Sequence, residues 1–157
     1  MRLALIALLA TLAGCSGAQP SASRRAAPPA APVDDGIPLG TLPRQQLAAG
    51  QCALFLWKAG NEARLVLMAR VDPPMARIAI GGQQMDLART NIAAGDGGSM
   101  FANAVYSDGT TTVTLDVRLE QRSTLQGGAV VTDGSLRLDR PDGESFVMPA
   151  AGLLACR

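Results

Sequence analysis

The sequence predicts an all-β domain, a small antiparallel β-sandwich or β-barrel of about eight strands. Three observations support this class. Apolar and polar residues alternate with a period of two in several segments, Asp-Gly pairs separate those segments, and Asp72-Pro73-Pro74 and Gly81-Gly82 mark further turns. The length suits one domain. Sequential hairpins at this spacing fit a sandwich and a barrel equally well, so both remain open.

The alternation is clearest over residues 112–119, where valine and leucine alternate with threonine, aspartate and arginine. This pattern is typical of a strand with one buried face. Residues 53–57 and 65–68 are apolar at successive positions, as expected of strands covered on both faces. We expect strands near residues 51–58, 63–71, 76–80, 83–88, 100–106, 110–120, 129–139 with a turn inside it, and 144–148.

The turns are predicted from Asp-Gly pairs. These pairs begin at Asp96, Asp108, Asp133 and Asp142, and the last three each separate two strand-like segments. Asp and Gly both tolerate the positive φ that a type I′ hairpin turn requires. We therefore expect a hairpin turn at each of these three positions.

The first 14 residues have the pattern of a signal peptide. Arg2 supplies a cationic head, and residues 3–12 form an apolar run that is too short to span a bilayer as a mature helix. The Leu-Ala-Gly-Cys sequence that ends at Cys15 resembles the lipobox of bacterial lipoproteins. That resemblance implies cleavage before Cys15, attachment of diacylglycerol to its thiol and acylation of its amine, for example with palmitate. Two or more acyl chains would anchor the protein stably to a membrane.

The same resemblance suggests a location. In lipoprotein sorting, an Asp directly after the lipidated Cys favours the inner membrane, and here that position is Ser16. We therefore expect an anchor in the cell envelope that faces the periplasm, with the outer membrane favoured over the inner membrane. Cleavage would leave 13 basic and 13 acidic side chains. A nearly neutral chain has little electrostatic attraction to acidic lipids, so the lipid anchor provides the attachment.

The segment after the lipobox is rich in Ala, Pro and Ser and cannot form a core. We interpret residues 15–40 as the lipidated Cys followed by a disordered tether, and residues 41–157 as the β-rich domain. At the start of this domain, Pro43 can begin a helical turn or two over residues 44–49, before Gly50.

Cys52 and Cys156 remain once Cys15 is assigned to the lipid. In an oxidising periplasm we expect them to form a disulfide that joins the first strand to the last residues. The alternative is a reactive thiol pair, which lacks both a Cys-x-x-Cys spacing and a neighbouring His.

The composition excludes several classes of function. The chain has no His, which removes the usual general base and the usual metal ligand, and its net charge of +1 is too small to hold a nucleic acid. Carboxylates at Asp96, Asp108, Asp133 and Asp142 could serve a glycosidase, but an Asp in a turn also bonds its own backbone. We expect no catalytic residue, no metal and no cofactor.

Candidate contacts with a partner are Trp57 and the glycine-rich loop that holds Asp96 and Ser99. Trp57 at a strand end is either an aromatic anchor for a partner protein or a glycan or, because it shares a strand face with Phe55, a core residue. The resulting expectation is a non-catalytic envelope lipoprotein that binds a protein or joins an envelope assembly through a strand edge or loop. The alternatives are an inhibitor of a periplasmic hydrolase, a carrier of a small ligand or lipid, and an enzyme with a carboxylate-based site.

Overall fold

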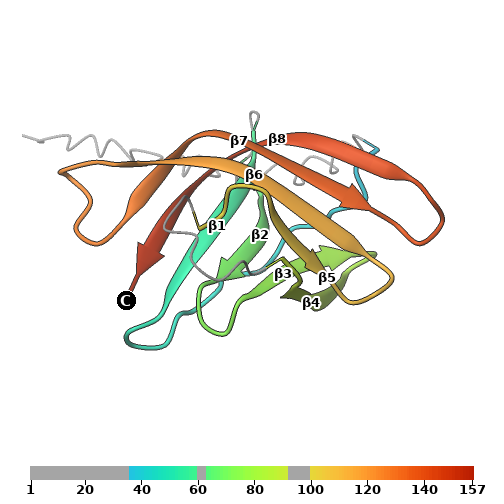
Figure 1. Ribbon diagram of the computed structural model, residues 1–157, viewed down its shortest axis with the longest axis horizontal. Coiled ribbons are helices and arrows are strands. Elements are labelled where there is room, and N and C mark those ends of the chain that lie inside the picture. Colours follow the sequence, from blue (N-terminus) through green and yellow to red (C-terminus); the bar gives the residue numbers. More distant parts are fainter. Residues whose placement is uncertain (1–35, 60–62, 92–99) are drawn as a thin grey trace, which may run out of the picture. The chain divides into compact units, whose positions relative to one another are not determined.

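The domain is a closed barrel of eight antiparallel strands (Figure 1). It is seen in a computed structural model that describes residues 36–59, 63–91 and 100–157. Each strand pairs with the next one in the sequence, and the last strand pairs with the first. The strands are β1 (Cys52–Lys58), β2 (Leu65–Arg70), β3 (Met75–Ile80), β4 (Gln83–Arg89), β5 (Ala104–Ser107), β6 (Thr112–Gln121), β7 (Ala129–Asp139) and β8 (Ser145–Cys156). The predicted all-β class is confirmed, as a barrel and not a sandwich.

The signal peptide, Cys15 and the tether up to residue 35 lie outside the described residues. Within the part of the chain that the structure describes, no helix has the length and apolar character needed to cross a membrane.

The interior of the barrel is filled by apolar side chains from all eight strands. The alternation that predicted β6 is confirmed, because Val113, Leu115 and Val117 are buried while Asp116 and Arg118 are exposed. An eight-stranded barrel has an interior just wide enough for its own side chains to fill. The largest fully buried side chains include Tyr106, Phe101, Leu54, Leu56, Leu67, Ile78, Leu87, Leu115, Leu136, Leu138 and Met148.

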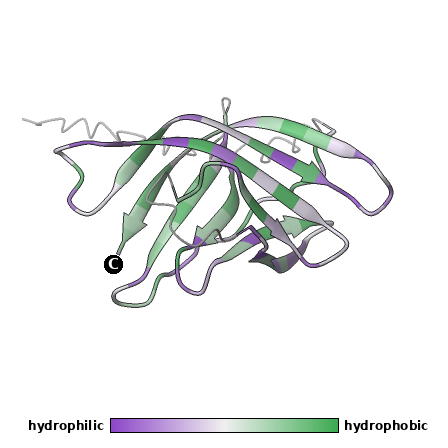
Figure 2. Ribbon diagram, viewed as in Figure 1, coloured by the Kyte–Doolittle hydropathy of each residue, from purple (hydrophilic) through white to green (hydrophobic). Residues whose placement is uncertain are grey.

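The outer face of β1–β3 carries a second, smaller apolar cluster. Leu42 packs there against Ala53 of β1, Met68 of β2 and Ala79 of β3, and all four side chains are buried. Leu47 adds a further contact from the same N-terminal segment. This cover explains why the sequences of β1 and β2 are apolar on both faces, and Figure 2 shows both strands mostly in green.

The segment that covers β1–β3 has no helix over residues 44–49, so the predicted helical turns there are wrong. Apart from a turn in which the amide of Gln51 donates to the carbonyl of Ala48 (3.1 Å), its backbone bonds to the barrel. The amide of Gly40 donates to the carbonyl of Ala79 (2.8 Å), and the amide of Leu42 donates to the carbonyl of Leu65 (2.7 Å). Leu39 forms an isolated bridge with Ile80, so contact with the barrel begins before residue 41. Burial of Leu42 on the sheet therefore outweighs the weak helical preference of this short stretch.

Hairpin turns form at two of the three predicted Asp-Gly pairs, but they are not type I′ turns, because Asp108 and Asp142 do not have a positive φ. Gly109 and Gly143 have φ values of +94° and +85° and close the β5–β6 and β7–β8 turns. At the first of these turns, the carboxylate of Asp108 accepts hydrogen bonds from the amides of Thr110 (2.9 Å) and Thr111 (2.8 Å). These bonds lower the pKa of Asp108.

The predicted turn at Asp133 is wrong, because Asp133 lies within β7 at a bulge between Val131 and Ser135. Gly134 is required there by close packing and not by a positive φ. A Cβ at Gly134 would lie 2.7 Å from the carbonyl oxygen of Ala150, which belongs to the neighbouring strand. An Asp-Gly pair is therefore equally compatible with a bulge in a long strand.

β8 extends to Cys156, well beyond its predicted end at residue 148. Pro149 does not stop the strand, because it lies opposite Ser135 beside the β7 bulge, where proline is tolerated. Further along, a Cβ at Gly152 would lie 2.1 Å from the carbonyl oxygen of Phe55. Only glycine allows β8 to approach β1 this closely.

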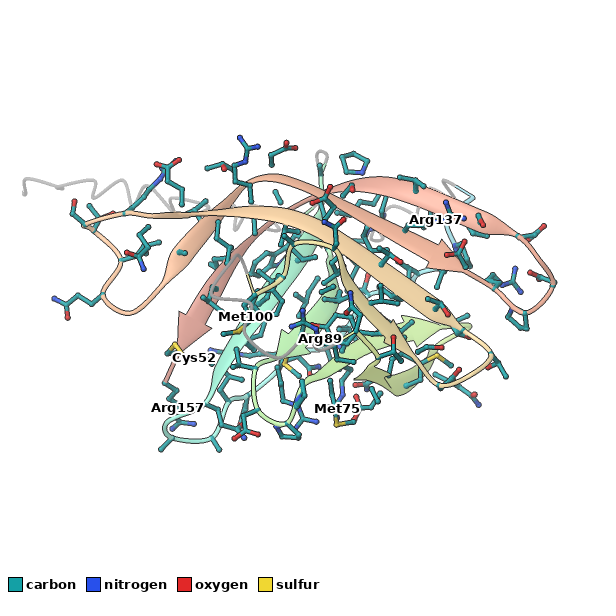
Figure 3. The ribbon with its side chains drawn as sticks, in the orientation of Figure 1. Cys52, Met75, Arg89, Met100, Arg137 and Arg157 are labelled. Atoms are coloured by element: carbon teal, nitrogen blue, oxygen red, sulfur yellow. A yellow bond between two sulfur atoms is a disulfide. The ribbon has the colours of Figure 1, made fainter. Side chains whose placement is uncertain are left out.

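The predicted disulfide between Cys52 and Cys156 is confirmed. The two residues lie directly opposite each other where β1 pairs with β8, with a Cα–Cα distance of 4.0 Å, and Figure 3 shows Cys52 beside the end of β8. Arg157 adds further links, because its backbone pairs with Gly50 and Gln51 and its Nη1 donates to the carbonyl of Leu47 (2.9 Å). The disulfide and the hydrogen bonds of Arg157 therefore hold together the paired ends of β1 and β8 and the covering segment.

Candidate functional site

The candidate site is a groove on the outside of the barrel, between β1, β2 and the covering segment. It has a volume of about 360 Å³. Its apolar wall is formed by β1 and β2, and its opposite wall by the covering segment. The lining residues are Leu42, Arg44, Gln45, Phe55, Trp57 and Leu65.

Phe55 and Trp57 reach this groove because the strand geometry of β1 directs them outward. Leu54 and Leu56 fill the barrel, so the alternate residues Phe55 and Trp57 lie on the outer face. Their ring centroids are 6.2 Å apart, within the range of favourable aromatic pairs. Both side chains are half-buried. The interpretation of Trp57 as a residue of the barrel core is therefore wrong, because the core is filled from the other face of the strand.

A bulge fixes the position of Trp57 against β2. The β1–β2 register shifts between Leu56 and Trp57, so that Trp57 pairs with Leu65 and leaves Val66 as the extra residue. Val66 is buried in the barrel. The bulge therefore keeps Leu65 on the outer face beside Trp57, where the two side chains form the apolar wall.

The polar side of the groove is formed by Arg44 and Gln45. Arg44 is exposed, whereas Gln45 is held in place by two hydrogen bonds. Its Nε2 donates to the carbonyl of Pro43 (2.8 Å), and its Oε1 accepts from Nη1 of Arg77 (3.3 Å). Arg77 also donates to both carboxylate oxygens of Asp86, each at 2.7 Å.

The hydrogen bonds between Arg77 and Asp86 lower the pKa of the carboxyl group and raise that of the guanidinium, although partial burial opposes both shifts. The pair is therefore charged on both sides at neutral pH and has no net charge. Among the described residues, the exposed charge that lines the groove is therefore the positive charge of Arg44. An apolar group that carries a neighbouring anion fits this chemistry.

Comparison with protein-family models, curated proteins and solved structures finds no match to this chain.

The carboxylates that could have served a glycosidase do not gather in the described residues. Asp108 lies in the β5–β6 turn and Asp142 in the β7–β8 turn, whereas Asp133 lies within β7. Asp133 shares a surface hollow of about 390 Å³ with Asp116 and Arg118. Asp96 and Ser99, which were predicted as partner contacts, lie outside the described residues.

Sequence reasoning missed the contribution of Leu42, Arg44 and Gln45, because residues 44–49 were expected to be helical. A signal for this cover was present in the sequence. Strands that are apolar on both faces need something to bury their outer face, and Leu42 and Leu47 are the large apolar residues just before β1.

One polar group inside the barrel stands apart from the groove. The hydroxyl of Tyr106 is buried and has no hydrogen-bond partner among the described residues. Burial raises the pKa of Tyr106 to about 12, although the positive charge of Arg89 acts in the opposite direction.

Proposed function

We propose that this chain is a membrane-anchored envelope lipoprotein, lipidated at Cys15, whose barrel binds a protein partner through the groove at Trp57. The observation that carries the proposal is the groove itself. It brings two aromatic side chains, two leucines and one exposed arginine together on the outside of a filled barrel. Aromatic residues and arginine are the side chains most enriched at the energetic centres of protein interfaces.

The chemistry of the groove specifies the complementary feature of the partner. Leu42, Phe55 and Leu65 favour burial of an apolar side chain next to Trp57. Arg44 favours an acidic residue within a few residues of that side chain, because its planar guanidinium binds a carboxylate in two-pronged geometry. The partner therefore presents an apolar residue beside an Asp or Glu.

The filled barrel argues against the carrier alternative. A carrier of this architecture would hold its ligand inside, but the interior is occupied by side chains such as Phe101, Leu87 and Met148. An inhibitor of a periplasmic hydrolase remains one member of the protein-binding class, since it too would act through a surface contact.

The proposal is tested by site-specific photo-crosslinking of the full chain in envelopes. A photo-reactive phenylalanine replaces Gln46, an exposed residue next to the groove residue Gln45, or, as the control, Val147, whose side chain is 65% exposed on β8. We expect one discrete crosslinked protein from position 46 and none from position 147. The additional substitution Trp57→Ala should remove the product from position 46, with the fold checked by circular dichroism.

Two results would contradict the proposal. Equal crosslinking from both positions, or a product that persists in Trp57→Ala, would mean that the groove does not bind the partner. The anchor is tested separately by the mass of the N-terminal peptide, which should carry acyl chains on Cys15, and by Cys15→Ser, which should release the protein from membranes.

A further inference from the structure

The joint between β4 and β5 leaves part of a strand edge open. β4 pairs with β5 at two positions, Ala88 with Ser107 and Arg89 with Tyr106, and this pairing does not continue towards the start of β4. β3, by contrast, pairs along β4 from Ala88 to Gln83. Among the described strands, residues 83–87 therefore have a neighbour on one side only, and Figure 1 shows β4 and β5 next to each other at this joint.

The hydrogen bonds at the end of β4 establish which groups face the open side. The amide of Arg89 donates towards β3, to the carbonyl of Pro74 (3.0 Å), and the amide of Thr90 donates towards β5, to the carbonyl of Val105 (2.8 Å). Because this direction alternates along an antiparallel strand, the main-chain groups of Gln84 and Asp86 face the same side as those of Thr90.

The main-chain groups of Gln84 and Asp86 have no hydrogen-bond partner on that side among the described residues. Both residues are exposed. Alternate residues of a strand whose N–H and C=O groups both point outward form a template for another extended backbone.

We infer that this edge binds a second copy of the chain, with the two β4 strands antiparallel across a two-fold axis at Met85. In this register, Gln84 of one copy lies opposite Asp86 of the other, and each pair exchanges two main-chain hydrogen bonds. The axis at Met85 is the register that uses all four open main-chain groups of each copy. The contact is isologous, as in most homodimers.

The charges on the edge favour this occupant and this register. The carboxylate of Asp86 is held by Arg77 at 2.7 Å, so the edge carries no net charge that would repel a second copy. With the axis at Met85, the side-chain amide of Gln84 stands opposite the carboxylate of Asp86, which is a favourable cross-strand pair. An axis at Asp86 would instead place two carboxylates opposite each other, which is unfavourable.

The inference is independent of the groove at Trp57, which lies on β1 and β2. The contact is short, with five residues from each copy, so it is smaller than a standard interface and exchanges rapidly. Two chains anchored in the same membrane would meet at a high effective concentration.

The test is disulfide trapping in the full chain, purified in a mild detergent. Met85→Cys places two thiols at the two-fold axis, where non-hydrogen-bonded residues have Cα atoms about 4.5 Å apart, within the range that a disulfide spans. A mild oxidant accepts the two electrons and two protons that are released when the bond forms. Val147→Cys, at an exposed residue of β8, reports random collisions, and the unsubstituted chain gives the background.

The blocking variant is Gln84→Pro in the Met85→Cys chain. Proline removes only the amide that faces the open side, so the hydrogen bonds between β3 and β4 remain. We expect the 85–85 disulfide, identified by peptide mass, to form at least ten times faster than the 147–147 disulfide, and we expect Gln84→Pro to reduce its rate to the level of the 147–147 disulfide. Circular dichroism checks that the barrel is intact.

Either of two results would overturn the inference. One is formation of the 85–85 disulfide no faster than that of the 147–147 disulfide. The other is an unchanged rate in the folded Gln84→Pro variant, which would mean that strand pairing does not bring the two copies together.

Discussion

Replacing Tyr106 by phenylalanine should stabilise the barrel. The Tyr106 side chain is fully buried and its hydroxyl has no hydrogen-bond partner among the described residues. Burying an unsatisfied hydroxyl costs about 1 to 3 kcal/mol, and phenylalanine keeps the ring while removing that cost. The expected gain in the free energy of unfolding at neutral pH is therefore about 1 to 3 kcal/mol.

The difference between the variant and the parent should grow at high pH. The pKa of Tyr106 is raised from 10.0 to about 12 in the folded chain, so the unfolded chain ionises first as the pH rises. The stability that comes with the neutral hydroxyl is fully present below pH 10 and is lost as the pH rises from 10 to 12. Raising the pKa of Tyr106 from 10.0 to about 12 corresponds to a loss of about 3 kcal/mol in the free energy of unfolding of the parent over this pH range. Tyr106→Phe has no tyrosine hydroxyl, so it should show no such loss.

The assay is urea unfolding of the full chain followed by circular dichroism, at neutral pH and in steps towards pH 12. Because Tyr106 is the only tyrosine, the absorbance of tyrosinate reports its titration directly. Tyr106→Leu serves as a control, since it removes the ring as well and should destabilise the barrel. A variant Tyr106→Phe that is less stable than the parent at neutral pH, or a folded parent whose tyrosine titrates near 10, would refute the reasoning.

Two further predictions concern the closure of the barrel between β1 and β8. Replacing both Cys52 and Cys156 by serine should lower the free energy of unfolding by about 2 to 5 kcal/mol, because the disulfide joins residues that are 104 positions apart in the sequence. A decrease of less than about 1 kcal/mol in urea unfolding would contradict this prediction. Gly152→Ala should cost at least about 3 kcal/mol or prevent folding, since its Cβ would lie 2.1 Å from a carbonyl oxygen of β1. Gly40→Ala is the matched control, because its Cβ would make an ordinary 3.5 Å contact, and equal thermal midpoints for the two variants would count against the steric argument.

The sequence predicted those parts of the fold that depend on local pattern. The alternation around Val113 and Leu115 identified β6, and the turns at Asp108 and Asp142 were correct because each needs only the residues of the turn itself. The bulge at Asp133 was missed because it depends on the approach of β8, which local sequence does not reveal. For the same reason the predicted end of the last strand was wrong, since its extension to Cys156 depends on pairing with β1.

The site was predicted less well than the fold, because its two walls come from different kinds of structure. Trp57 was recognised as a candidate from its own chemistry, and its place in the alternation of β1 made it share a face with Phe55. Only the closure of all eight strands into a barrel determines that the face of β1 with Phe55 and Trp57 lies outside. Arg44 and Gln45 belong to a segment whose path is determined by the surface that it covers, so no local pattern identified them.

The groove exists because the covering segment buries only part of the outer face of β1 and β2. Leu42 buries Ala53 and Met68, and the segment is held there by its bond to Leu65. The outer face around Trp57 remains partly open, so the protein keeps a half-buried aromatic wall that folding alone does not require. The start of this segment packs against the barrel core through Ile37 and Leu39, so a change in its path alters both the groove and the packing of that core. The residues that line the groove therefore also contribute to the stability of the barrel, because Leu42 is buried in the outer cluster.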